Sequence, residues 1–325
     1  MEFPFKKALV TGGAGFIGSH IIERLLNMGG EVVCVDDYTT GKIENLAGFS
    51  RDRLRVVECS VADYEALRPH FDGVDIVFHN AASKKTVCMD DPRLDLDVNA
   101  KGAFNVLELA RDFGVRKVVH ASTGSVYGEA RFFPQSETHP LDPTSFYGVS
   151  KLAGEKYCTL FSREFDMDIT VLRYFHVYGS RQDFSDGGGV VAIFATRSVK
   201  NLPLYIHGDG TQQRSFTYVD DLVDINMLVA TDSRSRGEVY NCASGIKVSI
   251  QELAENIRSL AGRPDLEIRY DDWMPGDIKV FDVDNSKIKN LGFEFKTSFG
   301  DGLRETFNWF AARAQESEGV TAASG

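Results

Sequence analysis

The first half of the chain alternates short apolar runs with longer segments in which apolar residues recur at helical spacing. The short runs predict buried strands at residues 8–10, 32–35, 56–59, 76–80, 117–121 and 169–173. The longer segments predict helices beginning at residue 19 and over residues 64–71, 98–113 and 148–165. This alternation predicts an α/β fold built on a doubly wound parallel sheet. Ligands of such sheets bind at the carboxyl ends of the strands, so we expect the chemistry there.

The pattern loosens after Tyr178 and Gly179, where loops lengthen and strands shorten. Helices are predicted over residues 250–261 and 301–313. We therefore expect a first domain over residues 1–178 and a smaller lobe over 179–313 that closes over the strand ends. The tail, residues 314–325, is small and polar without a periodic apolar face, so we expect it to be disordered.

A glycine-rich turn joins the first predicted strand to the first helix. The segment TGGAGFIG at 11–18 places glycines at 12, 15 and 18. Gly12 allows a tight turn out of the strand, Gly15 allows the backbone to approach a pyrophosphate, and Gly18 allows the helix to pack closely on the sheet. The first turn of the helix then offers free N–H groups to an anion.

An aspartate follows the second predicted strand at the distance that a dinucleotide site requires. Asp36 lies 18 residues after Gly18. A carboxylate in this place accepts hydrogen bonds from both hydroxyls of the adenosine ribose and repels a 2′-phosphate. The two signals together predict a site for NAD in preference to NADP, and the alternative is an ordinary strand-turn-helix that ends in a solvated aspartate.

Composition restricts the partners and the compartment. The 325 residues carry a net charge of −11, which argues against nucleic acid as a partner. No apolar run approaches the roughly 20 residues of a membrane span, and the first strand starts too close to Met1 for a signal peptide. The five cysteines have neither disulfide nor metal-ligand spacing. We therefore expect a cytoplasmic protein with reduced thiols, no metal site and no membrane contact.

A tyrosine and a lysine form the second candidate site. Tyr147 and Lys151 stand four residues apart on a predicted helix, so the ammonium lies one turn from the phenol. A fixed positive charge stabilises the phenolate and lowers the tyrosine pKa from about 10, which makes it a usable base. A surface tyrosine beside a solvated lysine is the common alternative. Thr123 ends the fifth strand, where it can hydrogen-bond the same substrate oxygen.

With these motifs the sequence resembles the extended short-chain dehydrogenase/reductase family. Within it the chain is similar to the NAD-dependent nucleotide-sugar epimerase/dehydratase group, of which UDP-glucose 4-epimerase is the best-known member. The resemblance covers nearly the whole chain. It includes TGGAGFIG at 11–18, DD at 36–37 with TG at 40–41, HNAA at 79–82, Asn99, ASTGSVYG at 121–128, Tyr147 with Lys151, RYFHVYG at 173–179, RSFTYVDD at 214–221 and PGD at 275–277.

The resemblance implies a Rossmann domain with a nucleotide-sugar lobe, and a 4-epimerase that works through a transient 4-keto sugar with tightly bound NAD. The implied catalytic set is Thr123, Tyr147 and Lys151. The implied cofactor-binding residues are Gly12, Gly15, Phe16, Ile17, Gly18, Asp36, Asp37, Ser60, Val61, Ala81, Ala82, Lys85, Asn99, Tyr147 and Lys151. The implied substrate-binding residues are Lys84, Thr86, Thr123, Ser125, His176, His207, Arg214 and Asp277.

Individual roles follow from the same resemblance. Lys85 is expected near the pyrophosphate of NAD, and Arg214 on the diphosphate of the sugar nucleotide, which suits a guanidinium. Asp277 is expected on the nucleotide ribose, and His207 stacked on the base. The substrate is expected to be UDP-linked. A homodimer through the helices at 98–113 and 148–165 is also implied, although their apolar faces could equally be core.

The sequence departs from the family pattern in three places. Ser60 stands where members often carry an acidic residue that reads adenine. The loop 83–92 is about two residues short, and it faces the sugar in relatives. His176 replaces a common asparagine. These differences leave the sugar open.

Three other functions remain open from the sequence. A dehydratase needs acid or thiol side chains after the catalytic threonine, where this chain has Gly124 and Ser125. An epimerase or decarboxylase of a nucleotide uronic acid needs a cation for the carboxylate, which Lys84 or Arg181 could supply. A non-catalytic NAD-sensing protein could use the same fold.

Overall fold

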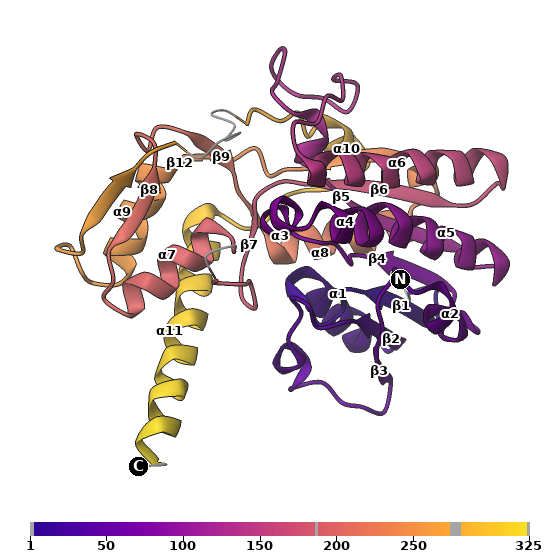
Figure 1. The fold of residues 1–325 in the computed structure, drawn as a ribbon, viewed down its shortest axis with the longest axis horizontal. Helices are drawn as coiled ribbons and strands as arrows, with labels where there is room; N and C mark the ends of the chain where they lie inside the picture. The colour runs from indigo at the N-terminus through magenta and orange to yellow at the C-terminus, as the bar shows by residue number, and fades with distance from the viewer. Residues whose placement is uncertain (1–2, 186–187, 274–280, 324–325) are drawn as a thin grey trace.

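The computed structural model describes residues 3–185, 188–273 and 281–323. Seven strands form a central sheet in the order β11-β6-β5-β4-β1-β2-β3 (Figure 1). All neighbouring strands in it are parallel. They are β1 Lys7–Thr11, β2 Glu31–Asp36, β3 Leu54–Glu58, β4 Ile76–His79, β5 Lys117–Thr123, β6 Ile169–Tyr174 and β11 Val239–Cys242. The predicted α/β fold with a doubly wound parallel sheet is confirmed.

Helices cover both faces of the sheet. On one face α1, Phe16–Asn27, lies beside α8, Val219–Thr231. On the other face α5, Gly102–Asp112, lies beside α6, Phe146–Glu164 (Figure 1). The short helices before α5 are α2 Tyr64–Leu67, α3 Lys85–Asp90 and α4 Pro92–Asp95, and a π-helix over Leu96–Lys101 joins α4 to α5. Apolar side chains from each helix layer and the sheet form the two largest hydrophobic cores.

The second half of the chain builds a smaller lobe from short strands and helices. Its strand pairs are β8 with β13 and β7 with β10, both parallel, and β9 with β12, antiparallel. The bounds are β7 Val177–Tyr178, α7 Val190–Val199, β8 Leu204–His207, β9 Gln213–Ser215, β10 Thr217–Tyr218, β12 Lys247–Ser249, α9 Ile250–Leu260, β13 Ile268–Asp271 and α11 Phe299–Ala323. The short helix α10, Ser286–Asn290, packs against β11 of the central sheet instead.

The chain does not divide between the two parts at residue 178. α8 returns to pack on α1 and β5, and β11 pairs with β6 as the last strand of the central sheet. The sequence analysis expected the whole of 179–313 to serve mainly the lobe, and it did not identify β11. A strand of four residues carries too little pattern to reveal which sheet it joins.

The C-terminal helix also differs from the expectation. α11 continues to Ala323, over a tail where the sequence analysis expects disorder. In Figure 1 its end leads away from the rest of the molecule. Alanine, glutamate and glutamine in the segment AQESEG have high helix propensity, which favours helix even where no apolar stripe is present.

A buried ion pair ties α6 to the sheet. The guanidinium of Arg173 on β6 donates to both carboxylate oxygens of Glu155 on α6, at 2.9 and 2.7 Å. The two side chains are 3% and 4% exposed. Ser122 of β5 donates to the same carboxylate, and Arg173 also donates to the hydroxyl of Tyr127 at 2.7 Å. Tyr127 in turn donates to Asn241 of β11, so one network joins α6 to three strands.

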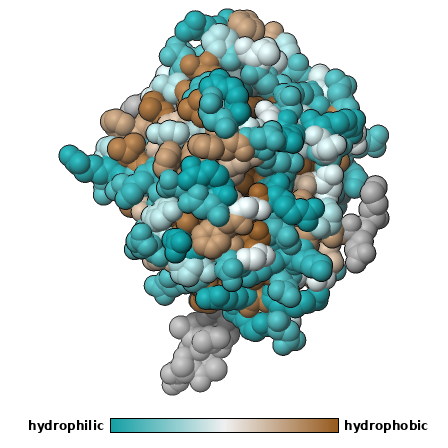
Figure 2. All heavy atoms as spheres, turned by 90° about the vertical axis from the view of Figure 1, so that its right-hand side faces the viewer, coloured by the Kyte–Doolittle hydropathy of each residue, from teal (hydrophilic) through white to brown (hydrophobic). Residues whose placement is uncertain are grey.

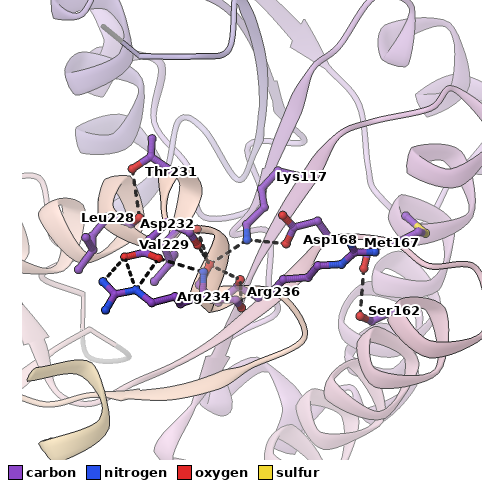
Figure 3. A network of polar contacts seen from close by, with 12 residues as sticks. Lys117, Ser162, Met167, Asp168, Leu228, Val229, Thr231, Asp232, Arg234 and Arg236 are labelled. Carbon is purple, nitrogen blue, oxygen red and sulfur yellow. Dashed lines mark hydrogen bonds and ion pairs between the residues drawn. The ribbon is translucent and has the colours of Figure 1, made fainter. Parts of the chain in front are cut away.

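A second polar network lies at the amino end of the same strands, away from the expected site (Figure 3). Lys117, at the start of β5, donates to Asp168 at 2.6 Å and to Ser235 at 2.9 Å. Ser235 donates to the carbonyl groups of Val229 and Asp232. Burial lowers the pKa of Lys117, and the contact with Asp168 opposes that shift. This network fastens the turn after α8 to the sheet.

The surface is mixed in polarity. Hydrophilic residues cover most of the face in Figure 2, with hydrophobic residues between them. Over the described residues, no helix is both long and apolar enough to cross a membrane.

The Glu155–Arg173 pair generates a stability prediction. Glu155→Gln keeps the shape of the side chain and removes its charge, which leaves a buried guanidinium uncompensated. We expect the free energy of unfolding to fall by about 3–5 kcal/mol, measured by urea denaturation. Glu164→Gln is the matched control, because Glu164 forms an exposed pair with Arg163 and should change stability by less than about 0.5 kcal/mol. A Glu155→Gln protein as stable as the control contradicts the assigned role.

Candidate active site

In the turn between β1 and α1, the backbone of the glycine segment packs directly against other backbone atoms. Gly12 has a φ of 63°, and its carbonyl accepts the N–H of Gly15 at 3.1 Å. A Cβ on Gly18 would lie 2.1 Å from the carbonyl oxygen of Gly12. A Cβ on Gly12 would lie 2.8 Å from the nitrogen of Ala81, in the loop after β4. Glycine is therefore required at both positions for the start of α1 to lie against the strand end.

Asp36 is held at the end of β2 by the neighbouring turns. Its carboxylate accepts the N–H of Ala14 at 2.9 Å and the N–H of Tyr38 at 2.9 Å. Burial raises the pKa of the carboxyl, and these backbone N–H groups oppose the shift. Gly41 lies so close that a Cβ there would be 2.4 Å from the carboxylate. The carboxylate is thus fixed in one orientation beside the glycine turn.

A cavity of about 280 Å³ lies along the carboxyl ends of the strands. Most of the predicted cofactor residues line it, and these are Gly12, Gly15, Phe16, Ile17, Gly18, Asp36, Asp37, Val61, Ala81, Ala82, Tyr147 and Lys151. The structure therefore brings the glycine turn, the acid and the Tyr147–Lys151 helix to one cavity. Lys84, expected on the substrate side, lines it as well.

Two of the predicted cofactor residues whose side chains the structure describes, Ser60 and Asn99, do not line the cavity. Ser60 lies between two residues that do, and its hydroxyl accepts the N–H of Ala62. Asn99 is 1% exposed, and its side chain is engaged with Ser83, Asp95 and Ser150. Asn99 is therefore placed to hold other residues, and its cofactor role stays a prediction. Lys85 and Thr86 begin α3, and their side chains lie outside the described part of the structure.

The sequence analysis missed several cavity residues. Val35, Thr39, Thr40, Cys59, Asn80, Ser83, Val87, Leu94, Val98, Ala121, Ser122 and Tyr174 also line it. The hydroxyl of Tyr174, at the end of β6, lies 3.3 Å from the side-chain oxygen of Asn80. The sequence could have indicated these residues only through their positions, because most of them adjoin a strand end or a predicted site residue. Their apolar or small side chains carry no chemical signature of their own.

Tyr147 and Thr123 meet at the end of β5. Their side chains interact, and this interaction lowers the pKa of Tyr147. Burial is the larger effect and raises that pKa to about 12, with Cys88 and Asp95 adding to the rise. The sequence analysis expected a lowered tyrosine pKa beside Lys151. That expectation is wrong for the protein without ligands, because burial of the phenol outweighs the stabilisation that it assigned to the lysine.

Lys151 lies beneath the cavity and is 2% exposed. Burial lowers its pKa to about 8, against the raising influence of Cys158, Glu155 and Asp95. The structure gives its ammonium no hydrogen bond or ion pair with the described residues. A buried cation without such contacts costs stability, so its presence at the cavity indicates a functional role.

Two buried histidines lie below this lysine. The rings of His79 and His120 are 5.1 Å apart, and the Nδ1 of His79 is 2.7 Å from the hydroxyl of Thr11. Burial lowers the pKa of His79 to about 3 and that of His120 well below its ordinary value, with Lys151 adding to both shifts. Both imidazoles are therefore neutral near pH 7 and do not compete with Lys151 for a proton.

The expected substrate residues form two groups. Ser125 lies beside Thr123, with its N–H on the threonine hydroxyl at 3.2 Å. Arg214 and His176 both lie beside Phe281, whose ring centre is 5.5 Å from the guanidinium carbon of Arg214 and 4.7 Å from the ring centre of His176. His207 is exposed at the end of β8 and does not join either group. Asp277 lies outside the described residues.

Both cations considered for a uronic acid are already paired. Lys84 forms an ion pair with Asp183, and this contact helps to lower the pKa of the Asp183 carboxyl to about 2. Arg181 forms an ion pair with Glu23 of α1. A sugar carboxylate would have to displace one of these partners.

Position 124 has no room for a catalytic side chain. A Cβ on Gly124 would lie 2.4 Å from the ring of Phe175. Cys88, another residue that could act as a base, donates its thiol hydrogen to Asp95 at 2.7 Å, and burial raises its pKa to about 12. Tyr147 is therefore the phenol at the cavity with both a hydroxyl partner and a neighbouring ammonium.

The residues fit a dinucleotide. The glycine turn admits a pyrophosphate because side chains at 12 and 18 are sterically excluded, and the fixed carboxylate of Asp36 suits the ribose hydroxyls. In the described part of the chain, no group of three or more histidine, cysteine, aspartate or glutamate residues is placed to hold a metal ion.

Comparison with known proteins agrees with this arrangement. The sequence pattern of the "NAD dependent epimerase/dehydratase family" matches residues 8–243. The chain is 36% identical over 317 residues to a UDP-glucose 4-epimerase of Mycolicibacterium smegmatis, covering 95% of this chain and 100% of that protein. It is 32% identical over 320 residues to a UDP-N-acetyl-alpha-D-glucosaminuronate decarboxylase of Bacillus cytotoxicus, covering 94% and 98%.

A solved structure is similar over nearly the whole chain. It is a UDP-glucose 4-epimerase of Thermotoga maritima with UDP-glucose, which is 36% identical and superposes with a TM-score of 0.90 over 95% of this chain and 99% of that one. The sequence match, the shared fold and the residues around the cavity agree. The chain therefore belongs to the NAD-dependent epimerase/dehydratase family.

Proposed function

We propose that the protein is an NAD-dependent 4-epimerase of a nucleoside-diphosphate sugar. The observation that carries this proposal is that Tyr147, which interacts with Thr123, and the buried Lys151 line one cavity together with the glycine turn and Asp36. The phenol of Tyr147, the hydroxyl of Thr123 and the ammonium of Lys151 lie together at the carboxyl ends of the strands. These three groups suit the oxidation of a secondary alcohol.

In the proposed reaction, Tyr147 as phenolate accepts the proton of the sugar C4 hydroxyl, and Thr123 holds the C4 oxygen. Lys151 keeps a positive charge beside the phenolate. NAD held by the glycine turn and Asp36 would supply the acceptor for the C4 hydride and the donor for its return. The 4-keto sugar turns over between the two transfers, so hydride returns to the other face. Tyr147 then gives its proton back to the C4 oxygen, and no net oxidation remains.

The proposed substrate is UDP-linked. The M. smegmatis and T. maritima relatives are named for UDP-glucose, which supports this choice. Arg214 would bind the diphosphate, with Phe281 supporting its guanidinium and His176 nearby. Lys84 and Ser125 would contact the sugar. His207, Asp277 and Thr86 keep their proposed substrate roles, and Lys85 its role near the pyrophosphate.

Two other enzyme chemistries fit the site less well. A dehydratase needs an acid beside the catalytic threonine, and the contact of Gly124 with Phe175 excludes one at that position. A uronic acid needs an unpaired cation, and Lys84 and Arg181 are both in ion pairs. A non-catalytic NAD sensor would gain nothing from a buried lysine that lacks a partner. A neutral sugar and a 4-epimerase are therefore favoured.

We also propose that the protein is a homodimer in the cytoplasm. Large apolar residues on α6 are exposed at helical spacing, with Phe146, Val149 and Leu160 exposed by 61%, 55% and 43%. A second copy that packs against α5 and α6 would cover them. All five cysteines are free and buried, which suits a reducing compartment.

The central test removes one oxygen atom. Tyr147→Phe keeps the ring and its packing, so we expect the variant to bind both ligands and to lose turnover by about 10²–10⁴-fold because the base is gone. Turnover is measured by mass spectrometry and chromatography of products from UDP-sugars. Tyr270→Phe is the matched control, since Tyr270 is 54% exposed and should keep native turnover. Retention of more than about a tenth of native turnover by Tyr147→Phe, with unchanged binding, would falsify the assignment of the base.

Cofactor choice is predicted to depend on Asp36. The native protein should bind NAD more tightly than NADP in calorimetry, because the carboxylate repels a 2′-phosphate. Asp36→Ala should narrow that preference. Asp52→Ala changes the net charge equally on the exposed surface and should leave the preference unchanged. Equal or tighter binding of NADP by the native protein contradicts the role of Asp36.

Dehydration is predicted to be absent. Incubation with dTDP-glucose should give no 4-keto-6-deoxy product, since position 124 has no room for an acid and Ser125 carries no carboxylate. The product is detected by its absorbance in alkali. Its formation at a rate comparable to epimerisation would mean that the protein is a dehydratase.

A further inference from the structure

A buried carboxylate lies behind the catalytic helix and belongs to none of the sites assigned above. Asp95 ends α4 and is 2% exposed. It does not line the cavity. Among the described residues it forms no ion pair, although burial of a charge normally demands one. An uncompensated buried charge beside a site with perturbed pKa values indicates a functional role.

Hydrogen bonds hold this carboxylate in place and connect it to α6. One oxygen of Asp95 accepts the thiol of Cys88 at 2.7 Å and the amide of Asn99 at 2.6 Å. The same amide of Asn99 lies 3.2 Å from the hydroxyl of Ser150. Ser150 donates to the carbonyl of Tyr147 at 3.0 Å, so the network ends on the turn that carries both catalytic residues.

The local backbone supports this arrangement. Asn99 lies in the π-helix over Leu96–Lys101, a form that is rare and concentrated at functional sites. Asn99 also accepts the N–H of Ser83, in the loop that lines the cavity. One amide side chain therefore links the cavity loop, the carboxylate and the catalytic helix.

We propose that Asp95 is a positioning residue whose fixed negative charge sets the pH at which the Tyr147–Lys151 pair loses its first proton. The inference deepens the proposed function, and it rests on Tyr147 and Lys151 being the catalytic pair. The negative charge of Asp95 raises the pKa of both Tyr147 and Lys151. It therefore delays loss of the first proton from the pair, whichever of the two residues releases it.

Among the groups around Tyr147 and Lys151, Asp95 is the carboxylate that no cation of the described residues pairs with. Four titratable groups raise the pKa of Tyr147 or Lys151, and they are Cys88 on α3, Asp95 on α4, and Glu155 and Cys158 on α6. Lys151 in turn lowers the pKa of two histidines, His79 on β4 and His120 on β5. Glu155 is neutralised by Arg173. Both histidines are neutral, and burial raises the pKa of both thiols. Asp95 raises the pKa of Tyr147 and of Lys151.

The sign of the effect follows from this geometry. Burial lowers the pKa of Lys151 to about 8, and Asp95 opposes that shift. Without the charge, the pair should lose its first proton at lower pH. Turnover requires that loss, because one proton must leave before a phenolate and an ammonium can coexist. The rising limb of the pH profile should therefore move to lower pH.

Asp95→Asn tests this, because the amide oxygen can still accept from Cys88 and Asn99. The first measurement is the pKa of the Lys151 side chain in the whole protein without substrate, followed by ¹⁵N NMR and assigned with Lys151→Arg. We expect a decrease of about one unit in Asp95→Asn. Asp95→Ser removes the same charge and provides a second variant with the same expected shift. Asp97→Asn is the matched control, since Asp97 is exposed in the same π-helix and should leave the pKa unchanged.

The second measurement is kcat/KM against pH for the NAD-loaded enzyme with its best UDP-sugar. We expect the rising limb to move down by about one unit in Asp95→Asn and to stay in place in Asp97→Asn. An unchanged lysine pKa in both Asp95 variants, or an equal shift in Asp97→Asn, would overturn the proposal. Absence of turnover with every sugar would instead contradict the proposed function, while the NMR titration would still decide the role of Asp95.

Discussion

The buried pair of Arg173 and Glu155 is the interaction on which the arrangement of the site depends. It fixes α6 against β6 with two charged hydrogen bonds, and Ser122 adds β5 through the same carboxylate. Thr123 is the next residue on β5, and Tyr147 and Lys151 lie on α6. The distance between the candidate base and its hydroxyl partner is therefore set by a contact beneath the cavity. Such a pair is costly to bury, and it is retained where precise placement matters more than stability.

The same region shows how burial controls charge at the site. The phenol of Tyr147 and the ammonium of Lys151 are both withdrawn from water, which raises one pKa and lowers the other. Burial therefore disfavours the charged form of each group. The Asp95 carboxylate and the Thr123 hydroxyl act in opposite directions on the pKa of Tyr147, which Asp95 raises and Thr123 lowers. Catalytic competence in this arrangement belongs to the whole cluster and not to a two-residue motif.

Ion pairs connect the first domain to the segment that follows β7. These are the pairs of Lys84 with Asp183 and of Arg181 with Glu23. They also neutralise the cations that a charged sugar would need. Gly124 against Phe175 excludes an acid by steric contact. The proposed preference for a neutral sugar thus depends on cations that are already paired and on the lack of space at position 124.

The sequence by itself determined the parallel α/β fold, the glycine turn, Asp36 and the Tyr147–Lys151 pair. These features depend on local spacing, since strand, turn and helix follow one another and four residues separate groups on one helix face. Only the tertiary structure decided that β11 completes the sheet, that Asn99 is enclosed by side chains and that Lys84 is paired. It also reversed the expected pKa of Tyr147. Burial, long-range pairing and desolvation depend on residues far apart in the chain, and no local pattern of apolar and polar positions records them.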